Sequence, residues 1–266
     1  MKNSKKNISV SAALATYNEE NNIVDCISSL KQVADEIIVV DGSSTDRTAD
    51  LAQTLGATVI KTTNKAMFHV NKNMAIDACR GKWVLLIDAD ERLSSALVGE
   101  IKKKVGENPV ENGFWLDRKN WFLGGFLKKG GAYPDRVIRL FKNGKGVLPE
   151  KSVHEQVKIT GKIGYLESNI IHLADPNFER YLIRAIRYTD RTADDLKVQS
   201  PGKGLAQIIN YMIFKPTFTF LNIYLRHKGY QDGFRGFIWA LFSAAHHFYA
   251  YGKYWSFNEN QKDAIN

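Results

Sequence analysis

Residues 83–92 have the sequence WVLLIDADER, in which five apolar residues are followed by two aspartates that flank one alanine. A run that is apolar on both faces is typical of a strand inside a parallel sheet, because helices cover both faces of such a sheet. In open α/β folds ligands bind beyond the carboxyl ends of the strands. The run therefore predicts a buried parallel strand, with Asp88 and Asp90 at its ligand-binding end.

The chain in front of this run alternates between strand-like and helix-like segments. Strand character recurs at residues 8–14, 36–40 and 58–61, and helical character at residues 19–33, 46–55 and 69–79. This alternation predicts an α/β fold with a doubly wound, mainly parallel sheet.

The expected secondary structure changes in the second half of the chain. Short strands are expected at residues 114–118, 136–141, 157–159 and 163–166, where glycine and proline punctuate the sequence. They predict an added region of antiparallel strands. Helical spacing returns after Pro176, so we expect an α/β domain over residues 1–175 and a helical, amphipathic and aromatic-rich C-terminal extension over residues 176–266.

Composition narrows the class of protein. With 266 residues, 44% hydrophobic and 24% charged, the chain has globular composition. Cys26 and Cys79 lie in expected helices, so a reducing compartment, the cytoplasm, is the simpler interpretation. The formal net charge of +9 is densest toward the C-terminus. A basic surface favours polyanions such as nucleic acid, anionic lipid or a phosphorylated substrate, although a basic protein without such a partner fits the charge too.

Three expected strands end in polar residues. These polar stretches are residues 15–20, 41–46 and 88–92. Each alone is explained by capping of the next helix, since Asn, Asp and Ser are common N-caps. The predicted topology, however, places all three at one edge of the sheet, where they would line a single crevice.

Asp88 and Asp90 have the chemistry of a metal site. Carboxylates two residues apart in an extended segment can share a hard divalent cation, Mg²⁺ or Mn²⁺, that leaves positions open for phosphate oxygens. Some phosphotransferases carry a similar pair in which the first Asp is a nucleophile, but theirs follows the first strand of the fold and this pair follows the fourth.

These motifs together resemble family 2 glycosyltransferases of the GT-A fold. The resemblance rests on the three strand ends, residues 69–73, and the segments 88–92, 130–135, 139–141 and 153–155. Within the family it is closest to the branch that includes the lipopolysaccharide core β-1,4-glucosyltransferases. It covers roughly the whole chain and is strongest over residues 8–172, and it implies that residues 1–175 are the nucleotide-sugar-binding and catalytic domain.

The resemblance implies roles for the donor-side residues. Thr16 and Tyr17 would contact the nucleobase, with Glu19 close by, and Asp41 would accept a hydrogen bond from a uracil ring. Lys72 would contact donor phosphate or base, unless it is an ordinary solvated helix lysine. Asp88 would lie near the ribose and the metal, and Asp90 would be the direct metal ligand.

The acceptor side is implied in the same way. Glu155 would be the base that takes the acceptor hydroxyl proton, with Glu150 as the alternative candidate. Relatives often carry an acidic pair where this chain has His154 and Glu155. His172 either is a third metal ligand, as in some relatives, or is a histidine satisfied within the core.

The resemblance thus implies an inverting, metal-dependent hexosyltransferase. It would move a hexose, with glucose favoured, from a UDP-sugar to a lipid-linked saccharide such as the inner core of lipopolysaccharide. The alternatives are another acceptor (polyprenyl phosphate, capsule or protein) or a degenerate relative that binds nucleotide-sugars without turnover. The chain lacks the G-x-G-x-x-G of dinucleotide-binding enzymes and any recognised nucleic-acid module, so neither class of partner is expected.

The C-terminal region indicates contact with a membrane surface. Residues 207–257 hold 16 of the chain's 30 aromatic residues, interspersed with basic ones. Lys215, Pro216, His246 and His247 interrupt the apolar stretches, so none reaches the ~20 residues of a spanning helix. We expect helices lying on an anionic membrane and a peripheral position on the inner face of the cytoplasmic membrane. Packing against the catalytic domain or a dimer contact is the alternative.

Overall fold

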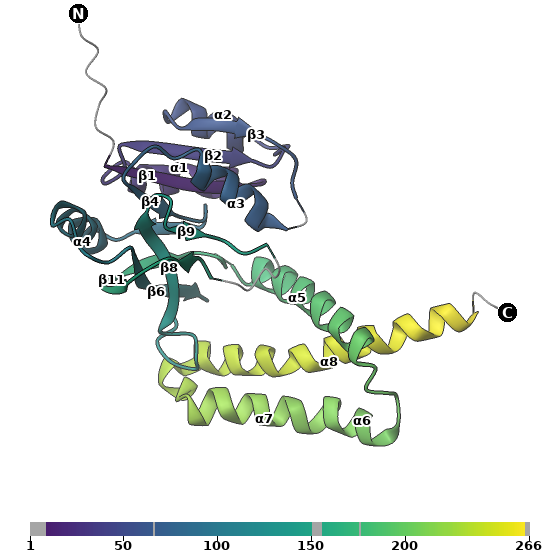
Figure 1. Ribbon diagram of the computed structural model, residues 1–266. Helices are drawn as coiled ribbons and strands as arrows, with labels where there is room; N and C mark the ends of the chain where they lie inside the picture. Colours follow the sequence, from purple (N-terminus) through teal and green to yellow (C-terminus); the bar gives the residue numbers. More distant parts are fainter. Residues whose placement is uncertain (1–8, 66, 151–155, 176, 264–266) are drawn as a thin grey trace, which may run out of the picture. The chain divides into compact units, whose positions relative to one another are not determined.

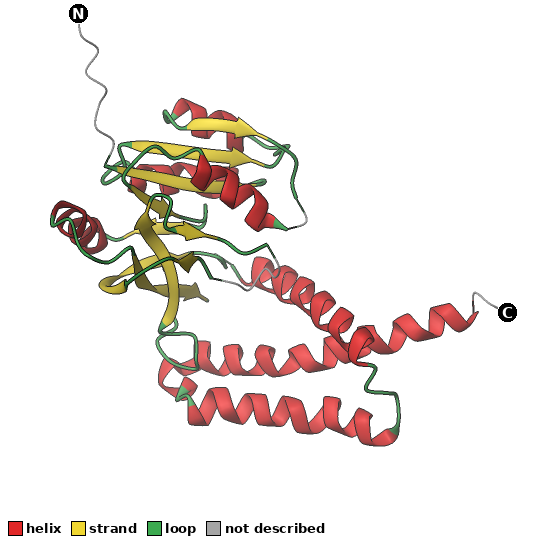
Figure 2. Ribbon diagram, in the orientation of Figure 1, coloured by secondary structure: helices red, strands yellow, loops and turns green. Residues whose placement is uncertain are grey.

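The computed structural model describes residues 9–65, 67–150, 156–175 and 177–263, with side chains described up to residue 257. The chain divides into two compact units. The first holds residues up to Lys119 and Asp135–Leu173, and the second holds Asn120–Pro134 and the chain from Ala174 onward. Figure 2 shows that the first unit combines strands with helices, whereas the second is mainly helical.

The first unit is built on one sheet. Its parallel half has the order β3-β2-β1-β4, formed by β1 (Val10–Thr16), β2 (Glu36–Asp41), β3 (Thr58–Lys61) and β4 (Trp83–Leu86). The order continues β8-β6-β11-β5 through β5 (Glu91–Leu93), β6 (Gly113–Phe122), β8 (Asp135–Lys142) and β11 (Ile163–His172). β8 is antiparallel to both β4 and β6, and β11 is antiparallel to β5. This is the predicted fold class, a mainly parallel sheet with an antiparallel addition.

Helices cover both faces of the parallel half. One face packs on α1 (Glu20–Leu30) and α2 (Thr48–Thr54), and the other packs on α3 (Phe68–Asp77), whereas α4 (Ser95–Gly106) packs on β11. The strands are apolar on both faces for this reason: in β4, Trp83 and Leu85 join the first core, whereas Val84 and Leu86 join the second. Figure 1 labels these elements.

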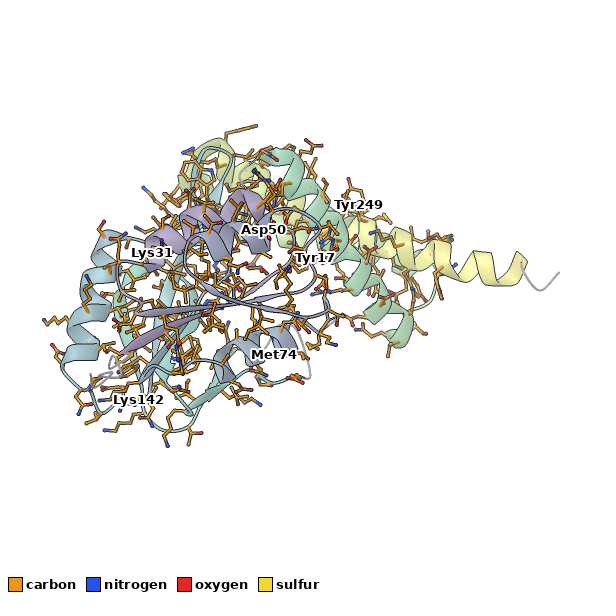
Figure 3. The ribbon with its side chains drawn as sticks, turned by 90° about the horizontal axis from the view of Figure 1, so that it is seen from above. Tyr17, Lys31, Asp50, Met74, Lys142 and Tyr249 are labelled. Atoms are coloured by element: carbon orange, nitrogen blue, oxygen red, sulfur yellow. The ribbon has the colours of Figure 1, made fainter. Side chains whose placement is uncertain are left out.

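The topology fixes which edge of the sheet can bind a ligand. Thr16 pairs with Asp41 at the carboxyl ends of β1 and β2, and the backbone N–H of Ile87 donates to the carbonyl of Ala13 at the end of β4. The three polar strand ends therefore share one edge, as the sequence predicted. Figure 3 shows Tyr17 at this edge and Lys142 at the opposite end of the strands.

The second unit is helical apart from one inserted loop. It contains α5 (Phe178–Gln199), α6 (Leu205–Ile209), α7 (Lys215–Leu221) and α8 (Gly233–Asp263), with the π-helical turns η1 (Asn210–Phe214) and η2 (Asn222–Arg226) and the 3₁₀ turn η3 (Gly229–Asp232). α8 packs against both α5 and α7. The remaining short strands are β7 (Gly125–Phe126), which pairs with the end of β6, and β9 (Gly146–Val147) with β10 (Lys158–Ile159) in the first unit.

The inserted loop belongs to the helical unit because its apolar side chains are buried there. Phe122, Leu127 and Ala132 form a core with Tyr181, against which Trp239 packs. The indole N–H of Trp239 donates to the carbonyl of Gly130, and the backbone N–H groups of Lys128 and Lys129 donate to the carboxylate of Asp232 at 3.0 and 2.8 Å. No helix among the described residues is both long enough and apolar enough to span a lipid bilayer.

Candidate active site

Asp88, which follows β4, is held between two cations. Its Oδ1 pairs with the ammonium group of Lys72 from α3, and its Oδ2 accepts a hydrogen bond from Arg139 of β8 at 2.5 Å. Burial raises the pKa of this carboxyl, but the charges of Arg139 and Lys72 outweigh that effect and hold the pKa well below its usual range. Asp88 is therefore a fixed anion whose two oxygens are already engaged.

Glu91 is a buried member of the charged cluster that Asp88 forms with Lys72 and Arg139. It is fully buried and accepts hydrogen bonds from Arg139 at 2.7 Å and from Arg118 at 3.3 Å. Its second oxygen accepts the backbone N–H of Asp88 at 3.0 Å. Burial lowers the pKa of Arg139, and the two carboxylates more than reverse this, so its pKa lies above the ordinary value. Glu91 thus fixes the backbone of the aspartate turn as well as the guanidinium.

A β-bulge explains how Arg139 reaches these carboxylates. Phe114 of β6 pairs with Leu140, but the next residue, Trp115, pairs with Ile138, so Arg139 has no partner in the ladder. A bulge bends the strand and re-aims the extra side chain. Arg139 is flanked by apolar residues and only 7% exposed, yet its guanidinium lies against Asp88 and Glu91.

Asp90 faces His172 across the pairing of β5 with β11. The Nε2 atom of His172 is 3.5 Å from Asp90 Oδ2, and the backbone N–H of Leu173 donates to the carbonyl of Asp90. Burial raises the pKa of Asp90, but the hydrogen bond and the charge of His172 outweigh it and lower the pKa. Two ligands of one octahedral cation lie about 3 Å apart. This carboxylate and imidazole therefore fit a pair of neighbouring ligands for Mn²⁺ or Mg²⁺, and Mn²⁺ suits imidazole better.

The predicted three-ligand metal set is only partly assembled. Within the described part of the chain, no group of three His, Cys, Asp or Glu side chains converges to hold a metal ion. Asp90 and His172 face each other at 3.5 Å, while both oxygens of Asp88 pair with Lys72 and Arg139. A cation held by Asp90 and His172 would have its remaining positions open to phosphate oxygens and water.

Hydrogen bonds tie together the carboxyl ends of β1 and β2, where the nucleobase was expected to bind. Asp41 is 1% exposed and accepts hydrogen bonds from Ser44, through its backbone N–H at 2.9 Å and its hydroxyl at 2.6 Å, and from the Thr16 hydroxyl at 3.3 Å. The side chain of Asn18 ties the two turns together by accepting from the backbone N–H of Thr45. A carboxylate has about four lone pairs, so Asp41 retains acceptor capacity.

Tyr17 and Glu19 lie next to this pair of turns. Tyr17 is 44% exposed, which leaves its ring available for stacking. Glu19 precedes the first residue of α1, and its carboxylate accepts from the side-chain amide of Asn22 at 2.7 Å. The position of Glu19 is thus set by the start of the helix.

Of the residues expected on the acceptor side, the structure describes Glu150 but not the two that follow it in the motif. Glu155 and His154 lie outside the described residues. The segment before them is anchored to α3: Asn73 donates to the carbonyl of Leu148 at 2.9 Å and to the carboxylate of Glu150 at 3.0 Å. His69 Nδ1 lies 2.6 Å from the carbonyl of Pro149. Glu150 is therefore described as an exposed carboxylate paired with Asn73.

Sequence reasoning assigned no role to three residues of the charged cluster: Glu91, Arg118 and Arg139. Charged residues inside otherwise apolar strands were the available signal, since such residues are buried only when paired. Arg139 stands between two pairs of apolar residues, and Glu91 follows the aspartate pair directly.

Comparison with known proteins identifies the family. Residues 11–122 match the model of glycosyl transferase family 2. The chain is 28% identical over 245 residues to the lipopolysaccharide core biosynthesis glycosyltransferase LpsC of Rhizobium meliloti, covering 90% of this chain and 89% of that protein. It is 30% identical over 241 residues to an uncharacterized glycosyltransferase of Rickettsia typhi, covering 86% of this chain and 80% of that protein.

Among solved structures, TarS of S. aureus in complex with UDP is similar, with a TM-score of 0.49 at 15% identity, covering 96% of this chain and 92% of that chain. The family match and the length of the similarity to the Rickettsia protein define the class: the chain belongs to glycosyltransferase family 2 and is a glycosyltransferase. Its mainly parallel sheet with antiparallel strands is the GT-A arrangement that the sequence resemblance implied.

Proposed function

We propose that this glycosyltransferase moves a hexose, with glucose favoured, from a UDP-sugar to a lipid-linked saccharide such as the inner core of lipopolysaccharide, with inversion at the anomeric carbon. The observation that carries the proposal is the pairing of Asp90 with His172 at the carboxyl edge of the sheet, beside Asp88. A metal ion bound there would neutralise the charge that develops on the departing diphosphate.

The donor would lie along the edge formed by β1, β2 and β4. Asp41 accepts a hydrogen bond from the uracil ring, and Tyr17 offers an aromatic face beside it. Lys72 is 8% exposed and held by Asp88, so its ammonium group has a fixed position from which to contact a donor phosphate. These contacts position the anomeric carbon for attack.

The reaction would be one displacement. The acceptor hydroxyl oxygen forms a bond to the anomeric carbon as the bond from that carbon to the phosphate oxygen breaks, and UDP leaves with the electron pair. Glu155 takes the hydroxyl proton, and Glu150 is the alternative base. The chain anchored by His69 and Asn73 leads directly into the segment that carries Glu155.

Two observations support a lipid-linked saccharide as the acceptor: the similarity to a known relative and an exposed apolar surface. The relative LpsC is a lipopolysaccharide core biosynthesis glycosyltransferase. A row of apolar side chains is exposed along η1, α7 and η2: Phe214 (65%), Phe218 (68%), Leu221 (45%) and Leu225 (56%). Their spacing of four, three and four residues is that of one helix face.

Two exposed basic side chains, Arg226 and Lys228, follow the end of this apolar row. Apolar residues flanked by basic ones suit the interface of an anionic membrane, where a lipid-linked acceptor would be presented. We therefore propose a peripheral position on the inner face of the cytoplasmic membrane.

The experiment is a transfer assay with stereochemical readout. The purified protein, UDP-[¹³C]glucose and a deacylated lipopolysaccharide core acceptor should give a product with a β-linked glucose from the α-linked donor, seen by NMR. GDP-mannose serves as the mismatched donor. A product with retained configuration would contradict the single displacement, and no product from either donor would contradict transferase activity on this acceptor.

A further inference from the structure

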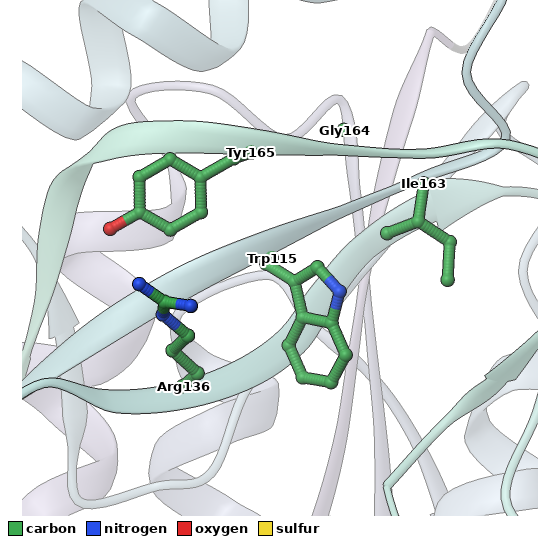
Figure 4. Close-up of a pocket in the computed structure, with 5 residues that line it drawn as sticks. All are labelled: Trp115, Arg136, Ile163, Gly164 and Tyr165. Atoms are coloured by element: carbon green, nitrogen blue, oxygen red, sulfur yellow. The ribbon is translucent and has the colours of Figure 1, made fainter.

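A hollow of about 600 Å³ lies on the antiparallel half of the sheet. It is lined by Trp115 of β6, Arg136 of β8, and Ile163, Gly164 and Tyr165 of β11 (Figure 4). α4 packs on the opposite face of β11 as part of the first core, whereas Trp115 packs at the edge of the second core. Ile163 and Tyr165 are 40% and 42% exposed, so the hollow opens outward at its β11 side.

A buried carboxylate organises the polar end of the hollow. Asp117 is 4% exposed and accepts a hydrogen bond from the hydroxyl of Tyr165 at 2.5 Å. Its other oxygen, 3.5 Å from Arg136 Nε, has no hydrogen-bond partner within the described chain. The guanidinium of Arg136 also lies over the Tyr165 ring, 5.5 Å from the ring centroid. Asp117 thus holds the tyrosine and the arginine in one arrangement, while 63% of the Arg136 side chain stays exposed.

The lining has the chemistry of a saccharide site. The faces of Trp and Tyr offer broad, rigid apolar contact that can pack on the C–H face of a sugar ring. A guanidinium binds phosphate or carboxylate through paired hydrogen bonds, and the exposed part of Arg136 is open to such an anion. A sugar that carries an anionic substituent satisfies both parts of the hollow.

The hollow also lies close to the candidate donor residues. Arg136 is three residues along β8 from Arg139, about 10 Å at the rise of a strand, and Arg139 contacts Asp88. Ile138, the ladder partner of Trp115, donates its backbone N–H to the side chain of Gln156 at 3.4 Å. Gln156 is the first described residue after the segment that contains Glu155. One strand therefore links the hollow, the charged cluster and the chain next to the candidate base.

We infer that Trp115, Arg136 and Tyr165 bind the acceptor saccharide, the two aromatic rings through a sugar face and Arg136 through an anionic substituent. The inference rests on the proposed glycosyl transfer and deepens it, because it assigns the acceptor subsite. Asp117 is a positioning residue that acts through Tyr165 and Arg136.

The test is calorimetric titration of a deacylated lipopolysaccharide core oligosaccharide into the whole protein in the presence of UDP and Mn²⁺. Trp115→Ala and Tyr165→Ala should each weaken oligosaccharide binding about tenfold or more. Tyr165→Phe, which keeps the ring and loses the bond to Asp117, should weaken it less. Lys103→Gln, an exposed cation on α4 with 76% side-chain exposure, is the matched control on the opposite face and should bind as the wild type does.

Two modified oligosaccharides identify the anion, one with phosphate removed and one with carboxyl groups reduced to alcohols. The wild type should bind more weakly the modified oligosaccharide that lacks the recognised anion. Arg136→Gln should bind the intact oligosaccharide just as weakly, and it should bind the intact and that modified oligosaccharide with equal affinity. If the wild type binds the intact and both modified forms equally, the anionic half of the inference is wrong.

Titration of UDP alone separates this inference from the proposed function. If Trp115→Ala, Tyr165→Ala and Arg136→Gln bind UDP with wild-type affinity but bind the oligosaccharide more weakly, the acceptor subsite is supported. Wild-type oligosaccharide affinity in Trp115→Ala and Tyr165→Ala overturns the inference and leaves the proposed transfer standing. A wild-type protein that binds UDP but no oligosaccharide overturns the inference as well, and the transfer assay then judges the function by itself.

Discussion

Asp88 and Asp90 stand two residues apart but lie in different electrostatic environments. Asp88 is paired with Lys72 and Arg139, whereas Asp90 faces the imidazole of His172. The pKa of each carboxyl lies below the ordinary range, so both are anionic at neutral pH. The two aspartates therefore differ in their surroundings: Asp88 holds two cations in place, and Asp90 is the carboxylate that we propose as a metal ligand.

Removing the cation at the centre of this cluster should be costly to stability. Arg139→Gln leaves the fully buried Glu91 and the partly exposed Asp88 without their shared partner, and removing one side of a buried ion pair costs about 3 kcal/mol or more. Urea unfolding measures the loss. Arg47→Gln is the control, because Arg47 is 76% exposed in its pair with Glu20, and exposed pairs contribute about 0–1 kcal/mol. Equal unfolding midpoints for Arg139→Gln and the wild type would show that the cluster does not stabilise the fold.

The secondary structure of the α/β unit follows from local sequence to a large extent. Two-sided apolar runs with capping residues after them mark β1, β2 and β4, and their carboxyl ends identify the site edge. The bulge at Arg139 and the short strand β5 carry no such local signal. Both depend on partners far along the chain, Phe114 and Trp115 for the bulge and Ile170 to His172 for β5. The aspartate pair was predictable because it directly follows an apolar run in the local sequence. The charged cluster around it was not, because Arg139 meets Asp88 and Glu91 only after distant segments of the chain have paired.

Two histidines join α8 to its neighbours. His246 Nε2 lies 2.8 Å from the hydroxyl of Thr192 in α5, and His247 Nε2 lies 2.8 Å from the hydroxyl of Thr219 in α7. Burial lowers the pKa of both, assisted by the charge of Lys253 at His246 and by His246 and Lys215 at His247. Each histidine is therefore kept neutral more readily in the folded chain than in the unfolded one.

Stability of the helical unit should consequently fall as pH falls. A histidine with a lowered folded pKa binds its proton better in the unfolded chain, so stability is complete above about pH 6.5 and declines below it. The thermal midpoint of the wild type should drop between about pH 7 and pH 5, and the drop should be smaller in His246→Gln/His247→Gln. A drop of the same size in the double variant would assign the pH dependence to other groups.

At the scale of the whole molecule, the chain leaves the α/β unit at Asn120 and returns at Asp135. The excursion is fixed by Phe122, Leu127 and the backbone bonds to Asp232 and Trp239. These partners are about a hundred residues away in sequence, so no local pattern indicates that the loop is buried against them. Local patterns indicate elements well, but they contain no information on which distant side chains bury an inserted segment.

The apolar row on η1, α7 and η2 makes the membrane proposal testable. Phe214→Ser/Phe218→Ser should reduce flotation with anionic liposomes at low salt by about tenfold or more, because each exposed phenylalanine would lose its buried apolar area. Phe257→Ser, a 42% exposed phenylalanine near the end of α8, is the control. Flotation should also weaken with added salt and with neutral lipid. If the wild type fails to float with anionic liposomes, the peripheral membrane position is wrong.

In the proposed mechanism Asp90 holds a metal ion that binds the diphosphate of a UDP-sugar. The most direct measurement is calorimetric titration of UDP into the protein with and without Mn²⁺, repeated with Asp90→Ala and with Asp25→Ala, an exposed carboxylate on α1, as control. We expect UDP to bind only with Mn²⁺, Asp25→Ala to bind as the wild type does, and Asp90→Ala to lose binding. UDP affinity that is the same without Mn²⁺, or unchanged in Asp90→Ala, would show that Asp90 does not hold a metal ion for the diphosphate.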